Sequence, residues 1–199
     1  MAKSDSFFIR ATIPTNGTTY AQDSVDLGAY VDALGKSVLR IHNIAVQYGS
    51  PLDTYAGAAN TSTSSCFQLT TQSQTAMVNA SDKSVIASGR LAIATGAAEV
   101  SMMSENLDVA PQHWTKGYLV GVEQIFLGVA QSFNHINRVT IVLECTVETL
   151  SQSAAMALAL SQQGGGRSGT GREDDPGRSS ACHRRWSPGS YCYAHGLAA

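Results

Sequence analysis

Two cysteines and two histidines lie close together near the C-terminus, as Cys182, His183, Cys192 and His195. Thiolate and imidazole groups are the ligands of small structural zinc sites, so this segment is the first candidate for chemistry. Such sites usually place a few residues between the two members of each ligand pair, so that each pair can close around one tetrahedral ion. Cys182 and His183 are adjacent instead, and adjacent side chains seldom face one ion. We therefore expect these four residues to hold no metal, and we predict no cofactor.

The segment LGKS at 34–37 is a second candidate, because GKS ends the phosphate-binding loop of many nucleotide-binding proteins. That loop needs an earlier glycine at the position that Tyr30 occupies here, and a helix after the serine. The residues after Ser37 have the pattern of a strand. We interpret LGKS as a turn between strands.

No other group of residues has the spacing of a catalytic site. His42, His113 and His135 lie on separate segments, where each is more simply a surface or hydrogen-bonded histidine. Glu123 lies on a predicted apolar strand face, and it is the one carboxylate for which burial would raise the pKa. The chain contains no G-x-S-x-G and no H-E-x-x-H segment. We predict that the protein is not an enzyme and has no catalytic residues.

Composition favours a protein whose surface is covered by neighbours. The chain has 199 residues, of which 43% are hydrophobic and 14% charged, with a formal net charge of −2. Soluble monomers carry about a quarter charged residues. So little charge also gives no basic field that would attract nucleic acid, and no specific nucleic-acid site is evident. The first residues lack the apolar run of a secretory signal, so we expect synthesis in a cytoplasm.

The elements that must position any site are mainly strands. Alternation of apolar and polar residues is clearest at 139–149, and further strands are predicted at 7–13, 38–48, 66–71, 85–94 and 117–130, with short ones at 18–31 and 98–103. About eight short strands without long helices between them indicate an antiparallel β-sandwich of the single jelly-roll type. The Ala- and Leu-rich segment 150–163 predicts a short C-terminal helix. Apolar periodicity ends at Gly164, which divides a domain at 1–163 from a disordered tail rich in Gly, Ser and Arg at 164–199.

The predicted strand 117–130 is apolar on both faces, although a sandwich by itself buries only one face of each strand. The second face must be covered by a helix of the same chain or by another subunit. The candidates for this subunit contact are Tyr118, Val120, Val122 and Phe126.

Three segments give the body of the chain a resemblance to a known family. They are DSVDLGAYVDALGKSVLRIHNIAVQY at 23–48, GYLVGVEQIFLGV at 117–129 and RVTIVLECTVETLSQSAAMALALSQQ at 138–163. Residues 5–163 resemble the small single-jelly-roll capsid proteins of tailless, membrane-containing icosahedral viruses of archaea and bacteria. The resemblance implies a structural virion protein without catalytic residues, which assembles with copies of itself into an icosahedral shell. A second capsid protein and contact with an internal membrane are left open as further partners.

A second function remains an alternative at this point. A non-catalytic β-sandwich that binds a carbohydrate or serves as an attachment module would need exposed aromatic rings or a calcium site. The series Tyr20, Tyr30, Tyr48 and Tyr55 is the sequence feature that favours it.

Overall fold

The computed structural model describes residues 3–32, 36–52, 59–97 and 101–163. The chain divides into two units, residues 1–168 and 169–199, and all described residues belong to the first. The predicted tail at 164–199 and its Cys182, His183, Cys192 and His195 lie outside the described residues.

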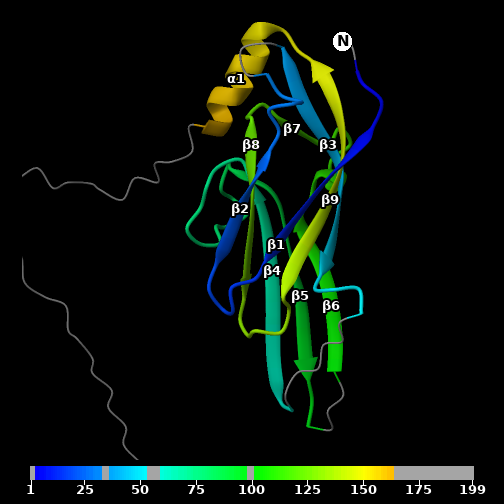
Figure 1. The fold of residues 1–199 in the computed structure, drawn as a ribbon, viewed down its shortest axis with the longest axis vertical. Helices are drawn as coiled ribbons and strands as arrows, with labels where there is room; N and C mark the ends of the chain where they lie inside the picture. The colour runs from blue at the N-terminus through cyan, green and yellow to red at the C-terminus, as the bar shows by residue number, and fades with distance from the viewer. Residues whose placement is uncertain (1–2, 33–35, 53–58, 98–100, 164–199) are drawn as a thin grey trace, which may run out of the picture. The chain divides into compact units, whose positions relative to one another are not determined.

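Two antiparallel sheets form the domain (Figure 1). One has the strand order β1-β9-β3-β7 and the other the order β2-β8-β4-β5-β6. The strands are β1 Phe7–Pro14, β2 Ala21–Asp26, β3 Ser37–Tyr48, β4 Thr61–Thr70, β5 Val85–Thr95, β6 Ser101–Val109, β7 Tyr118–Val120, β8 Gln124–Gln131 and β9 Arg138–Thr149. A short 3-10 helix η1 spans Pro111–His113, and the helix α1 spans Gln152–Gln163. Among the described residues, no helix is both long and apolar enough to span a lipid bilayer.

The strand order is that of a jelly roll. Without β6, the two sheets contain four strands each, β1-β9-β3-β7 and β2-β8-β4-β5, and the chain passes between the sheets at most of its connections. This interleaving of early and late strands is the double Greek key of the jelly roll. β6 pairs with β5 as a ninth strand at the edge of the second sheet. The predicted antiparallel β-sandwich of jelly-roll type is therefore confirmed, as is the C-terminal helix.

The core lies between the sheets and follows the predicted alternation. In β9 the four side chains Val139, Ile141, Leu143 and Cys145 are fully buried. Large residues of the second sheet that face them across the core are Phe67, Leu69, Ile125 and Leu127. Each side chain of this size contributes about 1.5–3 kcal/mol when it is removed from water. Burial also raises the pKa of the Cys145 thiol to about 12, so Cys145 stays neutral and serves as a small core residue.

A bulge changes the alternation within β3. The pairing of β3 with β9 shifts register between Ile41 and Asn43, which leaves His42 as the extra residue. Ile41 and Ile44 are consequently both buried, although strict alternation would place them on opposite faces.

The prediction of one strand over 117–130 is wrong, because this segment contains two strands in different sheets. β7 pairs with β3 in the first sheet, and β8 pairs with β2 and β4 in the second. Val120 faces the core from β7, while Ile125 and Leu127 face it from β8. The change of sheet at 121–123 shifts the alternation by one residue. Both apparent faces of the segment therefore contribute to one core.

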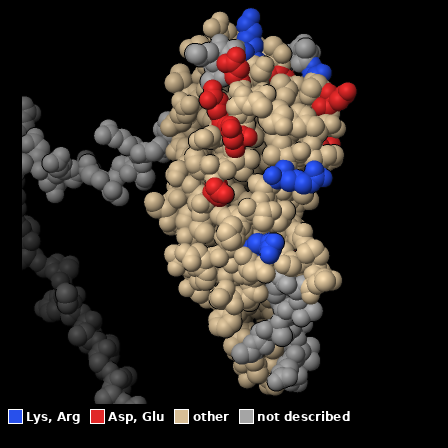
Figure 2. Space-filling model, viewed as in Figure 1, with Lys and Arg blue, Asp and Glu red and all other residues tan. Residues whose placement is uncertain are grey.

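Charged side chains are few on the face that carries β1 and β2, and acidic ones gather in one part of it (Figure 2). The residues Asp23 and Asp26 of β2 are exposed there. Glu123 lies beside them, since its backbone oxygen accepts a 2.7 Å hydrogen bond from the amide of Leu27.

Candidate subunit-contact site

A mainly apolar groove of about 700 Å³ lies on the outer face of the first sheet, at its β7 edge. Its lining residues are Arg40, Trp114, Lys116, Gly117, Tyr118, Leu119, Leu150 and Leu158. The rings of Trp114 and Tyr118 lie 6.3 Å apart and form one wall, and Leu158 of α1 contributes the other. Trp114 is 45% exposed, which is unusual for so large an apolar ring. The groove is therefore a candidate for contact with a partner.

An ion pair fixes the floor of the groove. The guanidinium of Arg40 on β3 donates two 2.7 Å hydrogen bonds to the two carboxylate oxygens of Glu148 on β9. The third arm of Arg40 donates to the backbone oxygen of Lys116, which ties the loop after η1 to the sheet. Hydrogen bonding to Arg40 lowers the pKa of Glu148. Glu148 is consequently a carboxylate at neutral pH, and its partner stays fixed.

Gly117 makes the turn between Trp114 and β7 possible. Its φ of +64° is in the left-handed region, and a Cβ at this position would collide with the backbone oxygen of Ile41. The amide of Gly117 also donates a 3.0 Å hydrogen bond to the backbone oxygen of Trp114. Glycine at 117 thus lets the loop carrying Trp114 lie directly against the edge of the sheet.

The helix α1 closes the other side of the groove through one glutamine. The side-chain amide of Gln162 donates a 2.7 Å hydrogen bond to the backbone oxygen of Leu119. Its Oε1 accepts a 2.8 Å hydrogen bond from the amide of Gly121. The side chain of Gln162 therefore pairs with the edge of β7 as a neighbouring strand would. The sequence predicted that either a helix of the same chain or another subunit covers this segment. At residues 119–121 the cover is the helix α1 of the same chain.

The four sequence candidates for subunit contact occupy three environments. Val120 and Val122 are 0% and 5% exposed and belong to the core of their own domain, so their burial requires no second subunit. Tyr118 is half-buried and lines the groove. Phe126 is half-buried on β8, in the other sheet. A subunit contact through Tyr118 or Phe126 stays a prediction.

Several groove residues have no recognisable signal in the sequence. Trp114 and Lys116 follow a 3-10 turn, and Leu158 belongs to a helix without a strong apolar stripe. The one sequence signal is Trp114 itself, a large aromatic residue within the otherwise polar segment PQHWTKG. The groove depends on the change of sheet at 121–123 and on the docking of α1, which are tertiary features.

The three described histidines lie in separate environments, and His113, in the 3-10 helix η1, is exposed. His42 on β3 lies 2.9 Å from the hydroxyl of Thr146, and desolvation lowers its pKa. The Nε2 of His135 lies 3.1 Å from the hydroxyl of Ser65, and its Nδ1 lies 2.6 Å from the backbone oxygen of Phe133. Sequence reasoning missed this serine–histidine pair. Ser65 is only 1% exposed, so a substrate carbonyl has no path to its hydroxyl.

The two remaining sequence expectations have opposite outcomes. Glu123 is exposed between β7 and β8, so it is not the buried carboxylate that the strand pattern predicted. The segment after Ser37 is a strand, as expected, so residues 34–37 do not precede the helix that a phosphate-binding loop needs. Within the described ranges, no three His, Cys, Asp or Glu side chains are grouped as metal ligands.

The three described tyrosines of the alternative function lie in different places and form no common aromatic platform. Tyr20 lies against Gly128 on the outer face of the second sheet, and Tyr30 stacks on Phe7. Tyr48 is buried, with its ring 6.4 Å from that of Phe67. Tyr55 lies outside the described residues.

Comparisons with known proteins place the chain in no family. No family model matches it, and no curated protein matches its sequence. Among solved structures, a chain of Desmodium yellow mottle tymovirus is 14% identical, with a TM-score of 0.31, over 73% of this chain and 86% of that chain. A TM-score this low carries no argument about function. The jelly-roll assignment rests on the strand order alone.

Proposed function

We propose that this chain is a structural virion protein that self-assembles into an icosahedral capsid shell. The observation that carries the proposal is a jelly roll with a wide apolar groove left open beside Trp114. Jelly rolls occur in viral capsids, lectins and cupins, so the fold alone does not decide between them. The icosahedral form of the shell comes from the resemblance described for residues 5–163.

The surface composition supports assembly over a monomeric function. Only 14% of the residues are charged, and large apolar side chains are exposed on several elements. Those at least half exposed are Phe8, Leu52, Met103, Met102, Phe133 and Leu160. A shell buries much of the surface of each subunit, which makes such side chains tolerable.

We also propose that the protein is not an enzyme. The hydroxyl of Ser65, which pairs with His135, is buried, and the ionisable side chains that line the groove are Lys116, Tyr118 and the paired Arg40. We further predict that the protein is located in the virion. A second capsid protein and contact with an internal membrane are predicted as further partners.

The experiment is negative-stain microscopy of the purified full chain, with binding to a glycan array measured in parallel. We expect closed particles and no glycan binding. A monodisperse monomer that binds a glycan would establish the ligand-binding alternative and refute the capsid proposal.

A further inference from the structure

The groove has a basic side chain at its rim that is not used within the domain. Lys116 is exposed, and the ion pairs among the described residues are Arg40–Glu148 and Arg90–Asp108. The ammonium of Lys116 therefore has no acidic partner among the residues described. An occupant of the groove should present an apolar group with negative charge beside it.

An exposed apolar group with negative charge beside it is present on the opposite side of the domain. Tyr30 is 37% exposed, and its ring stacks on Phe7 with the centroids 4.8 Å apart. The pair forms an aromatic ledge, which joins the start of β1 to the β2–β3 connection. The turn that carries Tyr30 begins directly after Asp26, because the amide of Tyr30 donates to the backbone oxygen of Leu27.

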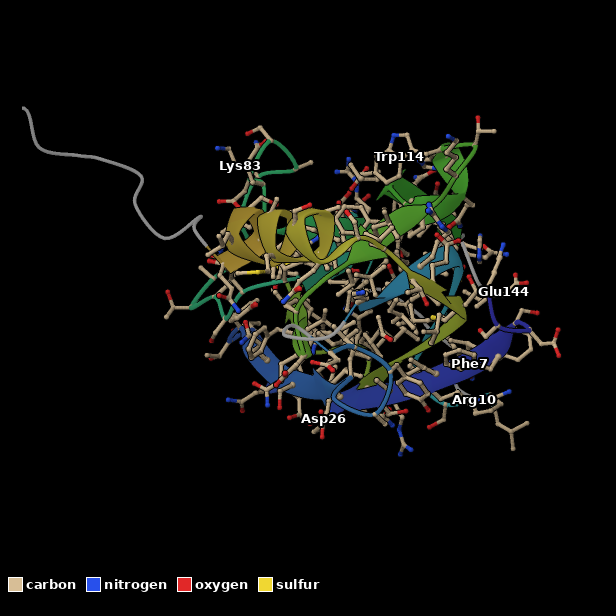
Figure 3. The ribbon with its side chains drawn as sticks, turned by 90° about the horizontal axis from the view of Figure 1, so that it is seen from above. Phe7, Arg10, Asp26, Lys83, Trp114 and Glu144 are labelled. Carbon is tan, nitrogen blue, oxygen red and sulfur yellow. The ribbon has the colours of Figure 1, made fainter. Side chains whose placement is uncertain are left out.

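Negative charge flanks this ledge. Asp23 and Asp26 are exposed, and their carboxylates accept hydrogen bonds from the backbone amides of Ser24 and Gly28. Neither carboxylate forms an ion pair with a basic side chain in the described ranges. Figure 3 shows Phe7 and Asp26 on the side of the molecule opposite Trp114.

We propose that the groove of one copy receives the Phe7–Tyr30 ledge of a second copy, with Lys116 facing Asp23 and Asp26. This inference rests on the proposed self-assembly and names the surfaces that perform it. The apolar ledge fills an apolar groove, and unpaired charges of opposite sign meet at the rim.

The positions of the two surfaces determine the type of contact. A two-fold contact would use the same patch on both copies, but the groove and the ledge lie on opposite sides. Each copy therefore offers its groove to one neighbour and its ledge to another. Such head-to-tail contacts close into rings when the rotation between copies permits, and a shell requires further contacts that join these rings.

Crosslinking between engineered cysteines tests the contact directly. The cysteines other than the buried Cys145, which are Cys66, Cys182 and Cys192, are first replaced by serine. Tyr30→Cys and Trp114→Cys are then introduced into one chain, which is treated with a short bismaleimide. We expect a ladder of covalent dimers, trimers and larger species. Each single variant should remain monomeric on a denaturing gel, and a mixture of the two single variants should stop at dimers.

The matched control replaces Phe133, an exposed ring in the loop after β8, by cysteine together with Tyr30→Cys. An equal ladder from this control would refute the contact. Dimers from Trp114→Cys alone would show a two-fold contact or a different occupant, and would also refute it.

Charge reversal at two exposed residues provides a second test, in which thermal melting of each variant checks that its fold is kept, because Asp26 also accepts a hydrogen bond from the amide of Gly28. Lys116→Glu and Asp26→Lys, each alone, should raise the concentration required for assembly about tenfold or more. The two substitutions in one chain should restore assembly to within a few-fold of the unmodified protein. A double variant that assembles no better than the weaker single variant would overturn the proposed pairing.

The tests distinguish this inference from the proposed function. If the unmodified protein never forms particles, the proposed function fails. If it forms particles but the ladder and the charge rescue are missing, the shell uses other surfaces and only this inference fails.

Discussion

The ion pair between Arg40 and Glu148 links the two central strands of the first sheet, β3 and β9, to the loop that carries the groove. Both side chains are mostly buried, and both carboxylate oxygens are paired with the guanidinium. Such charge-assisted, two-pronged pairs are stronger than exposed ones, and removal of one partner leaves a poorly solvated charge.

We predict that Glu148→Gln lowers the free energy of unfolding by about 1.5–3 kcal/mol at neutral pH, the range for hydrogen bonds to charged groups. Chemical denaturation measures this difference. The matched control is Asp108→Asn, which breaks the exposed 3.4 Å pair with Arg90 and should cost less than about 1 kcal/mol.

The pH dependence of this difference follows from the lowered pKa of Glu148. A carboxyl group whose pKa is lower in the folded state stabilises the protein above its ordinary pKa of 4.5 and loses this contribution as the pH falls through the folded value. The difference between Glu148→Gln and the unmodified protein should therefore be full at pH 7 and shrink below about pH 4.5. A difference that is constant from pH 7 to pH 3 would contradict the assignment.

At the scale of elements, the contact between α1 and β7 depends on Gln162. Replacement by leucine keeps the size of the side chain but leaves the backbone oxygen of Leu119 and the amide of Gly121 without their partner. We expect Gln162→Leu to cost about 2 kcal/mol and to abolish the protection of the Gly121 amide against hydrogen exchange. Gln163→Leu, at an exposed position of the same helix, is the control and should change neither.

The position of the loop after η1 depends on Gly117. Gly117→Ala combines a left-handed backbone with a collision against the Ile41 carbonyl, so we expect a cost of about 2–3 kcal/mol in unfolding experiments. Gly17 has a φ of +56° and open space around its Cβ position, so Gly17→Ala isolates the backbone effect, about 1 kcal/mol. Equal costs for the two variants would show that the close approach to Ile41 is not a constraint.

The sequence predicted most elements because alternation reflects burial on one face of a sheet. β1, β3, β5, β9 and α1 appear close to their predicted ranges. Segment 117–130 was misinterpreted for a physical reason. Its alternation shifts by one residue where the chain changes sheet, and a strand with two apolar faces has the same pattern. The partners of Arg40 and Gln162 were not predictable, because the contacts join residues more than 40 positions apart.

At the scale of the whole molecule, the described residues form two paired sheets with a core between them. We expect a chain that ends at Gln163 to melt within a few degrees of the full chain, because the described strands and α1 all precede this point. Calorimetry of the two chains tests this expectation.

Metal analysis of the full chain tests the prediction that the tail binds no zinc. One tightly bound equivalent of zinc in the full chain would contradict our interpretation of Cys182, His183, Cys192 and His195.

Self-assembly into a closed shell is the central claim, and light scattering combined with size-exclusion chromatography tests it most directly. A closed shell has a fixed number of subunits, because the contacts of every copy are satisfied at closure. We predict monomer and one large species, whose mass stays constant while its fraction rises with protein concentration. A monomer at all concentrations, or a mass that grows continuously, would contradict a closed shell.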